Sequence, residues 1–196
     1  MDEYKTILGL IAAALSLAAH IPYIVTLLRG TNRPHIFTWL IWTLLTAIAF
    51  AAQIAGNAGP GAWTMGVTAL MCVIITALTL RRGEKNITKL DWVMFLGGLA
   101  AIPVWMATSS PFYAVIIISL IDALAYGPTI RKSWHAPYNE NIAMYAVNIV
   151  RHMLGIASIA TYSLVTTLYP AMLFVMNAAT FIILTARRGK LCAQKD

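Results

Sequence analysis

The sequence Leu78-Thr79-Leu80-Arg81-Arg82-Gly83 closes one long apolar stretch of this chain, and Leu184-Thr185-Ala186-Arg187-Arg188-Gly189 closes another 106 residues later. Each apolar run ends in two arginines and a glycine. An apolar α-helix of roughly 20 residues crosses the ~30 Å hydrocarbon core of a bilayer. Arginines beside the end of such a helix favour one side of the membrane. The two endings therefore predict membrane-spanning helices that finish on the same side.

Seven apolar stretches alternate with short polar connections along the chain. Hydrophobic residues make up 60% of the sequence and charged residues 11%, which is typical of a polytopic membrane protein and unlike a soluble domain. The predicted fold class is therefore all-α, with seven transmembrane helices. The expected helices cover residues 6–28, 36–55, 62–80, 92–107, 112–130, 142–163 and 168–186.

The basic residues are distributed unequally between the two sides. Of 14 lysines and arginines, twelve fall in the connections and tail on one side, and the other side carries only Lys5. Because basic residues stay cytoplasmic, we expect a multi-pass plasma (bacterial inner) membrane protein with its N-terminus outside and its C-terminus in the cytoplasm. The net charge of +7 then reflects orientation and contact with lipid headgroups, and no nucleic-acid partner is expected. The twelve are Arg29, Arg33, Arg81, Arg82, Lys85, Lys89, Arg131, Lys132, Arg187, Arg188, Lys190 and Lys195.

The matched endings are part of an internal repeat. At the same 106-residue offset, Pro22 near the end of the first stretch matches Pro128 near the end of the fifth. The chain then divides into a three-helix repeat (1–90), a linker helix (91–108) and a second three-helix repeat (109–196). A single linker helix gives both repeats the same orientation in the membrane, so the repeat is parallel.

This arrangement resembles the SWEET and PQ-loop transporter superfamily, with its 3+1+3 helices, and points to an uncharacterised bacterial branch of it. The family marks its first and fifth helices with a proline, often followed by glutamine, before a short basic turn. Pro22 and Pro128 occupy those places, but Tyr23 and Thr129 stand where the glutamine is usual. Sugar-transporting relatives usually carry an asparagine in helices 3 and 7. Asn177 fits that pattern, whereas its partner in the repeat is Met71.

The two prolines are the predicted gating residues. A proline inside a helix removes one backbone hydrogen bond and clashes with the preceding turn. Pro22 and Pro128 would therefore let each repeat bend near its cytoplasmic end. A static kink, which is common in membrane helices, is the alternative interpretation.

Two ionisable residues are expected near the bilayer centre. Asp122 lies about eleven residues into the fifth stretch and Arg151 about ten into the sixth, which places both at roughly 15 Å depth. A charge there costs at least ~2.5–3.5 kcal/mol unless it has a partner or a wet cavity. The pair is therefore interpreted either as a buried salt bridge that locks the second repeat or as the charged wall of a transport cavity.

Helix periodicity adds further polar groups to that wall. Tyr145, Asn148 and His152 share one face of the sixth helix. Trp39 and Trp42 lie opposite Tyr145 and Asn148 in the repeat, either as packing residues or as an aromatic side of the cavity. The predicted substrate-binding residues are Trp39, Trp42, Asp122, Tyr126, Tyr145, Asn148, Arg151 and Asn177.

Three residues are candidates for proton coupling. The ordinary pKa of histidine suits a proton switch, which makes His20 and His152 candidates together with Asp122. A lone histidine in a membrane helix is more often a structural hydrogen-bonding group. We therefore favour Asp122 with His152 over His20.

The leading hypothesis is a secondary transporter or facilitator that moves a small polar or amphipathic solute (sugar, vitamin- or nucleoside-like, or amino-acid-like) by alternating access around a midplane site. The alternatives are a seven-helix ligand sensor and a structural membrane subunit with a buried salt bridge. The expected partners are the small-molecule substrate and the lipid bilayer, with homo-oligomerisation left open.

Enzymatic and cofactor-binding functions lack support in the sequence. Residues 168–186 contain no lysine to attach retinal. His20 and His152 lie at unlike depths for ligating one haem. No nucleophile and base stand at helical spacing, and Cys72 and Cys192 form no metal motif. We expect no enzyme activity, no cofactor and no metal site.

Overall fold

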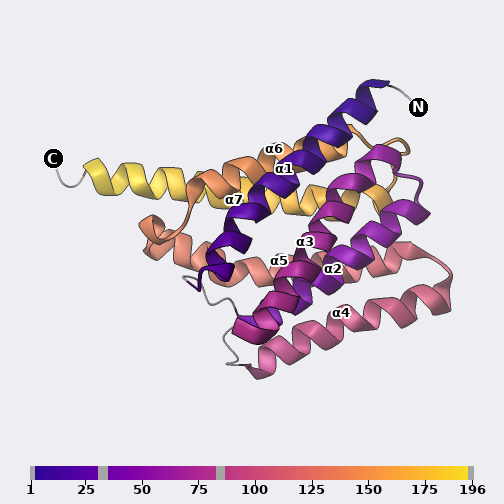
Figure 1. Ribbon diagram of the computed structural model, residues 1–196, viewed down its shortest axis with the longest axis horizontal. Coiled ribbons are helices and arrows are strands. Elements are labelled where there is room, and N and C mark those ends of the chain that lie inside the picture. Colours follow the sequence, from indigo (N-terminus) through magenta and orange to yellow (C-terminus); the bar gives the residue numbers. More distant parts are fainter. Residues whose placement is uncertain (1–2, 31–34, 83–86, 194–196) are drawn as a thin grey trace.

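Seven α-helices and two short 3₁₀ turns form most of the protein in its computed structural model (Figure 1). The structure describes residues 3–30, 35–82 and 87–193. Three of the twelve basic residues lie outside these ranges: Arg33, Lys85 and Lys195. The described parts also exclude the side chains of Arg82, Lys132 and the predicted gating residue Pro128. The helices are α1 (Glu3–Leu28), α2 (Ile36–Ala55), α3 (Ala62–Arg82), α4 (Lys89–Thr108), α5 (Pro111–His135), α6 (Ile142–Ala157) and α7 (Leu164–Ala193), with 3₁₀ turns η1 (Gly59–Gly61) and η2 (Pro137–Asn139).

Six of these helices are long and apolar enough to cross a membrane, and α6 is the shorter exception. They indicate an all-α, membrane-embedded protein, as the sequence predicted. The predicted sixth span of 142–163 is too long, because α6 ends at Ala157 after 16 residues. At 1.5 Å per residue it is about 24 Å long, less than the hydrocarbon thickness.

The sequence between α6 and α7 explains the early end of α6. The Ser163 hydroxyl accepts a hydrogen bond from the Thr166 backbone N–H at 3.3 Å, and Thr166 Oγ1 accepts one from the Ser163 N–H at 2.9 Å. This reciprocal cap starts a new helix. As a result α7 begins at Leu164, four residues before the predicted start at 168.

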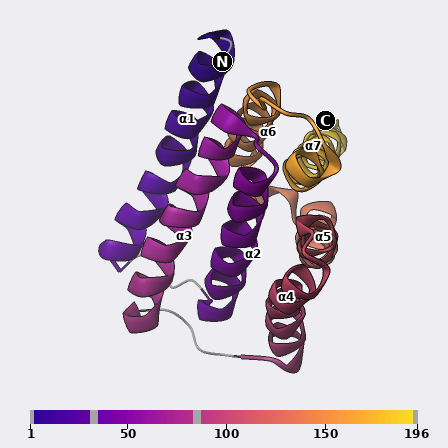
Figure 2. The same ribbon diagram turned by 90° about the vertical axis from the view of Figure 1, so that its right-hand side faces the viewer.

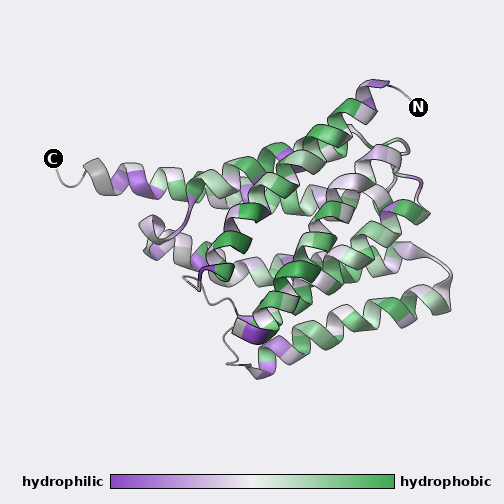
Figure 3. Cartoon of the chain, in the orientation of Figure 1, coloured by the Kyte–Doolittle hydropathy of each residue, from purple (hydrophilic) through white to green (hydrophobic). Residues whose placement is uncertain are grey.

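The helices cross between two ends of the molecule. Figure 1 shows the N-terminus, the α2–α3 connection and the α6–α7 connection at one end, and the C-terminal end of α7 with the start of α4 at the other. Hydrophilic positions gather at the latter end in Figure 3. It carries Arg29, Arg81, Lys89, Arg131, Arg187, Arg188 and Lys190, and we call it the basic end.

Helix packing follows one pattern on both sides of α4. In the first half α3 packs against both α1 and α2, and in the second half α7 packs against both α5 and α6. The two halves meet chiefly where α1 packs on α6 and α2 on α5. Figure 2 shows α3 between α1 and α2 in this bundle.

Helix α4 lies at the edge of the bundle against α2 and α5. It begins three residues earlier than the predicted 92, because Thr88 and Asp91 form a capping box with a 2.7 Å bond from the Thr88 N–H to the carboxylate. Gly97 faces Ile121 of α5, and Gly98 faces Leu45 of α2. These small residues allow the helices to approach closely.

The end opposite the basic end is closed by contacts between the two halves. The Ala160 N–H donates to the Ala58 carbonyl at 2.8 Å, and Gln53 Nε2 donates to the Thr166 carbonyl at 3.0 Å. A Cβ added to Gly61 would lie 2.6 Å from Ile159 Cγ1 and 2.8 Å from its Cα. No side chain fits between these two backbones. We call these contacts, at the end that the sequence predicts to lie outside, the outer seal.

The packing of α4 predicts the effect of a bulky residue at Gly98. A Cβ at Gly98 would already lie 3.0 Å from Leu45 Cδ2, so Gly98→Leu should destabilise the protein by about 1–3 kcal/mol and lower its melting temperature in detergent. Gly127→Leu in α5 is the control, because nothing lies within 4 Å of a Cβ there. Equal melting temperatures for the two variants would contradict this account of how α4 packs.

Candidate functional site

A cavity of about 360 Å³ lies between the two halves of the bundle. Its lining comes from α1, α2 and α3 on one side and α5, α6 and α7 on the other, and no described residue of α4 contributes. It is partly open, and toward the basic end its lining reaches His35, Thr38 and Met144. The volume is in the usual range of about 300–1,000 Å³ for small-molecule sites.

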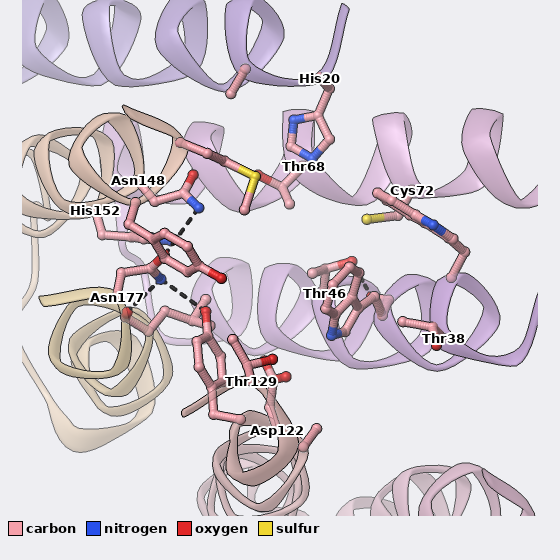
Figure 4. Close-up of a pocket in the computed structure, with 18 of the residues that line it drawn as sticks. His20, Thr38, Thr46, Thr68, Cys72, Asp122, Thr129, Asn148, His152 and Asn177 are labelled. Atoms are coloured by element: carbon pink, nitrogen blue, oxygen red, sulfur yellow. Dashed lines mark hydrogen bonds between the residues drawn. The ribbon is translucent and has the colours of Figure 1, made fainter. Parts of the chain in front are cut away.

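The structure brings the predicted substrate-binding residues together in this cavity. Trp39, Trp42, Asp122, Tyr126, Tyr145, Asn148, Arg151 and Asn177 all belong to its lining, and so do His20 and His152. In Figure 4, Asn148, His152 and Asn177 lie on one side and Thr38, Thr46 and Cys72 on the other. That these residues bind a substrate stays a prediction.

Arg151 enters the cavity from the middle of α6. Its guanidinium Nη1 donates to Ser16 Oγ in α1 at 3.2 Å and to Thr68 Oγ1 in α3 at 3.0 Å. Its Nε is buried and has no hydrogen-bond partner. A guanidinium has five N–H donors, so these two hydroxyls leave part of its donor edge free. The side chain is only 7% exposed.

Asp122 in α5 reaches the same cavity from the other side. Its Oδ2 accepts a hydrogen bond from the Tyr169 hydroxyl at 2.9 Å, and its Oδ1 accepts none. The sequence allowed Asp122 and Arg151 to pair directly. Within the described part of the chain the carboxylate and the guanidinium are not within 4.0 Å of one another. The direct form of the pair is therefore not present, and hydroxyl groups from other helices hold each charged group. A pair through water, the other form that the sequence allowed, stays a prediction.

An amide network joins the three helices of the second half. Asn148 Nδ2 donates to Asn177 Oδ1 at 3.0 Å, and Asn177 Nδ2 donates to the Tyr126 hydroxyl at 2.9 Å (Figure 4). Asn177 Nδ2 also reaches the Leu173 carbonyl at 2.8 Å. These bonds fix the orientation of two amides and a phenol at the cavity wall.

The two histidines differ in how they are held. His20 Nδ1 lies 2.7 Å from the Ser16 carbonyl oxygen, an arrangement that suits the structural role considered for it. His152 is 1% exposed, and neither of its ring nitrogens has a hydrogen-bond partner. An unpartnered imidazole beside a cavity is poised to bond a ligand or water.

Aromatic rings form the opposite wall. Tyr23 and Trp39 have ring centroids 4.8 Å apart, and Trp39 and Trp42 have centroids 5.2 Å apart with their planes nearly perpendicular. The Trp39 indole N–H donates to the Tyr23 hydroxyl at 3.1 Å. We call these three residues the aromatic cluster. The sequence left two roles open for Trp39 and Trp42, packing and cavity lining. Both tryptophans pack against other rings and also line the cavity.

The predicted gating prolines are each next in sequence to a residue of the lining, Pro22 to Tyr23 and Pro128 to Thr129. Pro22 is inside α1, which continues to Leu28, and its side chain is exposed. Pro128 falls within α5, and its side chain lies outside the described residues. These positions are compatible with a gate and with a static kink, so the gating role stays a prediction.

Sequence reasoning missed Tyr169, which is 1% exposed and donates to Asp122. It was placed at the outer start of a helix beginning at 168, whereas α7 begins at Leu164. The cap formed by Ser163 and Thr166 was the sequence signal for an earlier helix start. That start would have placed Tyr169 further from the helix end. Thr68 was also missed, because a threonine in a membrane helix ordinarily bonds its own backbone, as Thr68 also does to the Thr64 carbonyl.

The arrangement offers hydrogen-bond donors, acceptors and an aromatic surface, and no metal-binding cluster. Among the described residues no group of three or more His, Cys, Asp or Glu could hold a metal ion. Comparisons with protein-family models, with curated proteins and with solved structures found no match.

The amide network predicts a measurable coupling between helices. Asn177→Ala removes its bonds to Asn148 and Tyr126 and should cost about 1–3 kcal/mol, since it leaves buried polar groups unpaired. In a double-mutant cycle with Tyr126→Phe, melting in detergent should give a coupling energy of about 0.5–3 kcal/mol. Thr185→Ala is the control, because Thr185 is exposed and bonds only its own helix. Strictly additive effects would exclude the network as a source of stability.

Proposed function

We propose that this protein is a secondary transporter or facilitator of a small polar or amphipathic solute. The observation that carries the proposal is the cavity between the halves, which is large enough for a small molecule and is lined on the side of the second half by Asp122, Arg151 and His152, each with a buried polar atom that has no partner. A dry static seam would leave those groups unsatisfied at a cost of about 1–3 kcal/mol each. A polar solute or water offsets that cost.

Helix packing supports the parallel repeat that such a transporter needs. If α1, α2 and α3 are equivalent to α5, α6 and α7, the contact of α1 with α6 becomes that of α5 with α2. Both contacts are present, and so are the equivalent α3–α6 and α7–α2 contacts. The pattern is that expected of a pseudo-two-fold axis along the membrane normal, with α4 as the linker.

The orientation follows from the basic end. Lysines and arginines favour the cytoplasmic side, so we place the basic end and the C-terminus in the cytoplasm and the N-terminus outside. The cavity then opens inward and is closed outward by the outer seal. Rocking of the halves about the midplane would break the outer seal and close the basic end, which is alternating access.

A structural subunit is less well supported than it was from the sequence. That alternative relied on a salt bridge between Asp122 and Arg151, and the two side chains are instead held by Tyr169 and by Ser16 and Thr68. A ligand sensor uses the same cavity as a transporter. Solute movement across the membrane separates the two functions.

Uptake into proteoliposomes tests the proposal. Purified protein should accumulate or equilibrate at least one labelled solute from a panel of sugars, nucleosides, amino acids and organic acids, and empty liposomes should not. Asn148→Ala should slow that uptake, because Asn148 lines the cavity. If no solute moves, although ligands raise the melting temperature of the protein, the transporter proposal fails and a sensor is indicated.

Cross-linking of the outer seal predicts a reversible block of transport. In a Cys72→Ser, Cys192→Ser background, Ala58→Cys with Ala160→Cys joins the halves where the Ala160 N–H contacts the Ala58 carbonyl. Oxidation should abolish uptake and a reductant should restore it, because the outer end cannot open while linked.

The matched control links two helices of one half. Thr43→Cys with Thr76→Cys joins α2 and α3, whose threonine hydroxyl oxygens lie 2.9 Å apart. This bond should leave uptake intact, since the halves move as units. Unchanged uptake after verified cross-linking of residues 58 and 160 would refute opening at the outer seal.

A further inference from the structure

The charge of Arg151 is without an anionic partner in the described part of the chain. No carboxylate oxygen lies within 4.0 Å of its guanidinium there, and its bonds go to the neutral hydroxyls of Ser16 and Thr68. Arginine stays protonated in proteins. A buried cation needs a compensating charge or a wet cavity, and the space beside Arg151 is the cavity itself.

The two hydroxyl bonds hold the guanidinium without neutralising it. Nη1 donates both bonds, to Ser16 Oγ in α1 and to Thr68 Oγ1 in α3, while Nε stays unpartnered. One side of the planar group is thus anchored to the first half and the other is free. A free guanidinium edge matches the two oxygens of a carboxylate.

We propose that the counter-ion of Arg151 is a carboxylate of the transported solute. This inference rests on the proposed function and names its substrate class: organic monocarboxylates with an aromatic or apolar body. The unpartnered ring nitrogens of His152, the next residue in α6, offer a further hydrogen bond to the same acid group.

The charges that line the cavity favour a solute with a single acid group. Arg151 supplies a single positive charge, and Asp122 lines the same cavity. A dianion such as a phosphate monoester would bring a second negative charge toward the Asp122 carboxylate. Like charges in a buried site repel strongly, so a monocarboxylate is favoured over a phosphate.

The position of the aromatic cluster defines the rest of the solute. Thr68, which holds Arg151, and Cys72 are one helical turn apart in α3, about 6 Å along the axis. Cys72 packs in one apolar cluster with Trp39, Tyr23 and Trp42. An aromatic ring separated from its carboxylate by a short linker therefore reaches both the guanidinium and the aromatic cluster.

Binding to the purified wild-type protein tests the substrate class without any substitution. Titration calorimetry in detergent should show phenylacetate binding roughly 30-fold or more tightly than its neutral isostere phenylacetamide, since the amide leaves the buried charge uncompensated. Phenyl phosphate should bind more weakly than phenylacetate. Equal binding of acid and amide, or tighter binding of phenyl phosphate, overturns the proposal.

Variants of Arg151 separate a recognition role from a structural one. Arg151→Gln should abolish the preference for phenylacetate over phenylacetamide, and Arg151→Lys should retain a reduced preference because the charge remains without the fork. Arg29→Gln, at an exposed position beyond α1, should keep the wild-type preference. A folded Arg151→Gln variant with an unchanged preference refutes the role. The wild-type acid-to-amide ratio decides the matter if that variant does not fold.

Uptake distinguishes failure of this inference from failure of the transporter proposal. Transport of neutral solutes by a protein that neither binds nor moves phenylacetate overturns the carboxylate assignment and leaves the transporter intact. Selective phenylacetate binding, with no panel compound moved, keeps the carboxylate as the counter-ion and overturns transport.

Discussion

The burial of one guanidinium inside an apolar bundle constrains the rest of this structure. Arg151 is 7% exposed in a helix of 16 residues and is held by hydroxyls from α1 and α3. A cation at that depth is tolerated only if the surrounding helices supply polar groups and space. The cavity, the hydroxyl anchors and the contact between α6 and the first half all meet this requirement.

Polar groups bond one another within each half of the bundle, and Arg151 bonds Ser16 and Thr68 across the space between the halves. Asn148, Asn177 and Tyr126 bond one another within the second half, and Thr43 bonds Thr76 within the first. Asp122, Arg151 and His152 line the cavity, and each has a buried polar atom without a hydrogen-bond partner. Two packed halves with a partly polar cavity between them suit a protein that binds a solute there.

Much of the candidate site could be predicted from residue type and helical position. Ionisable and amide residues are costly in a bilayer, so Asp122, Arg151, Asn148 and Asn177 were conspicuous among apolar neighbours. Tyr169 was not, because a tyrosine near a helix end is ordinarily an interfacial residue. The direct contact of Asp122 with Arg151 could not be decided from the sequence, because equal depth says nothing about position around the bundle axis.

The sequence by itself determined the helical class, the positions of the helices and the side of the bundle that carries the basic residues. Each of these follows from local composition, since an apolar stretch of given length has few alternatives in a membrane. The tertiary structure alone decided which groups meet and that a cavity lies between the halves. Those features depend on the rotation and packing of helices, which are set by contacts between residues far apart in the chain, such as Ser16 and Arg151.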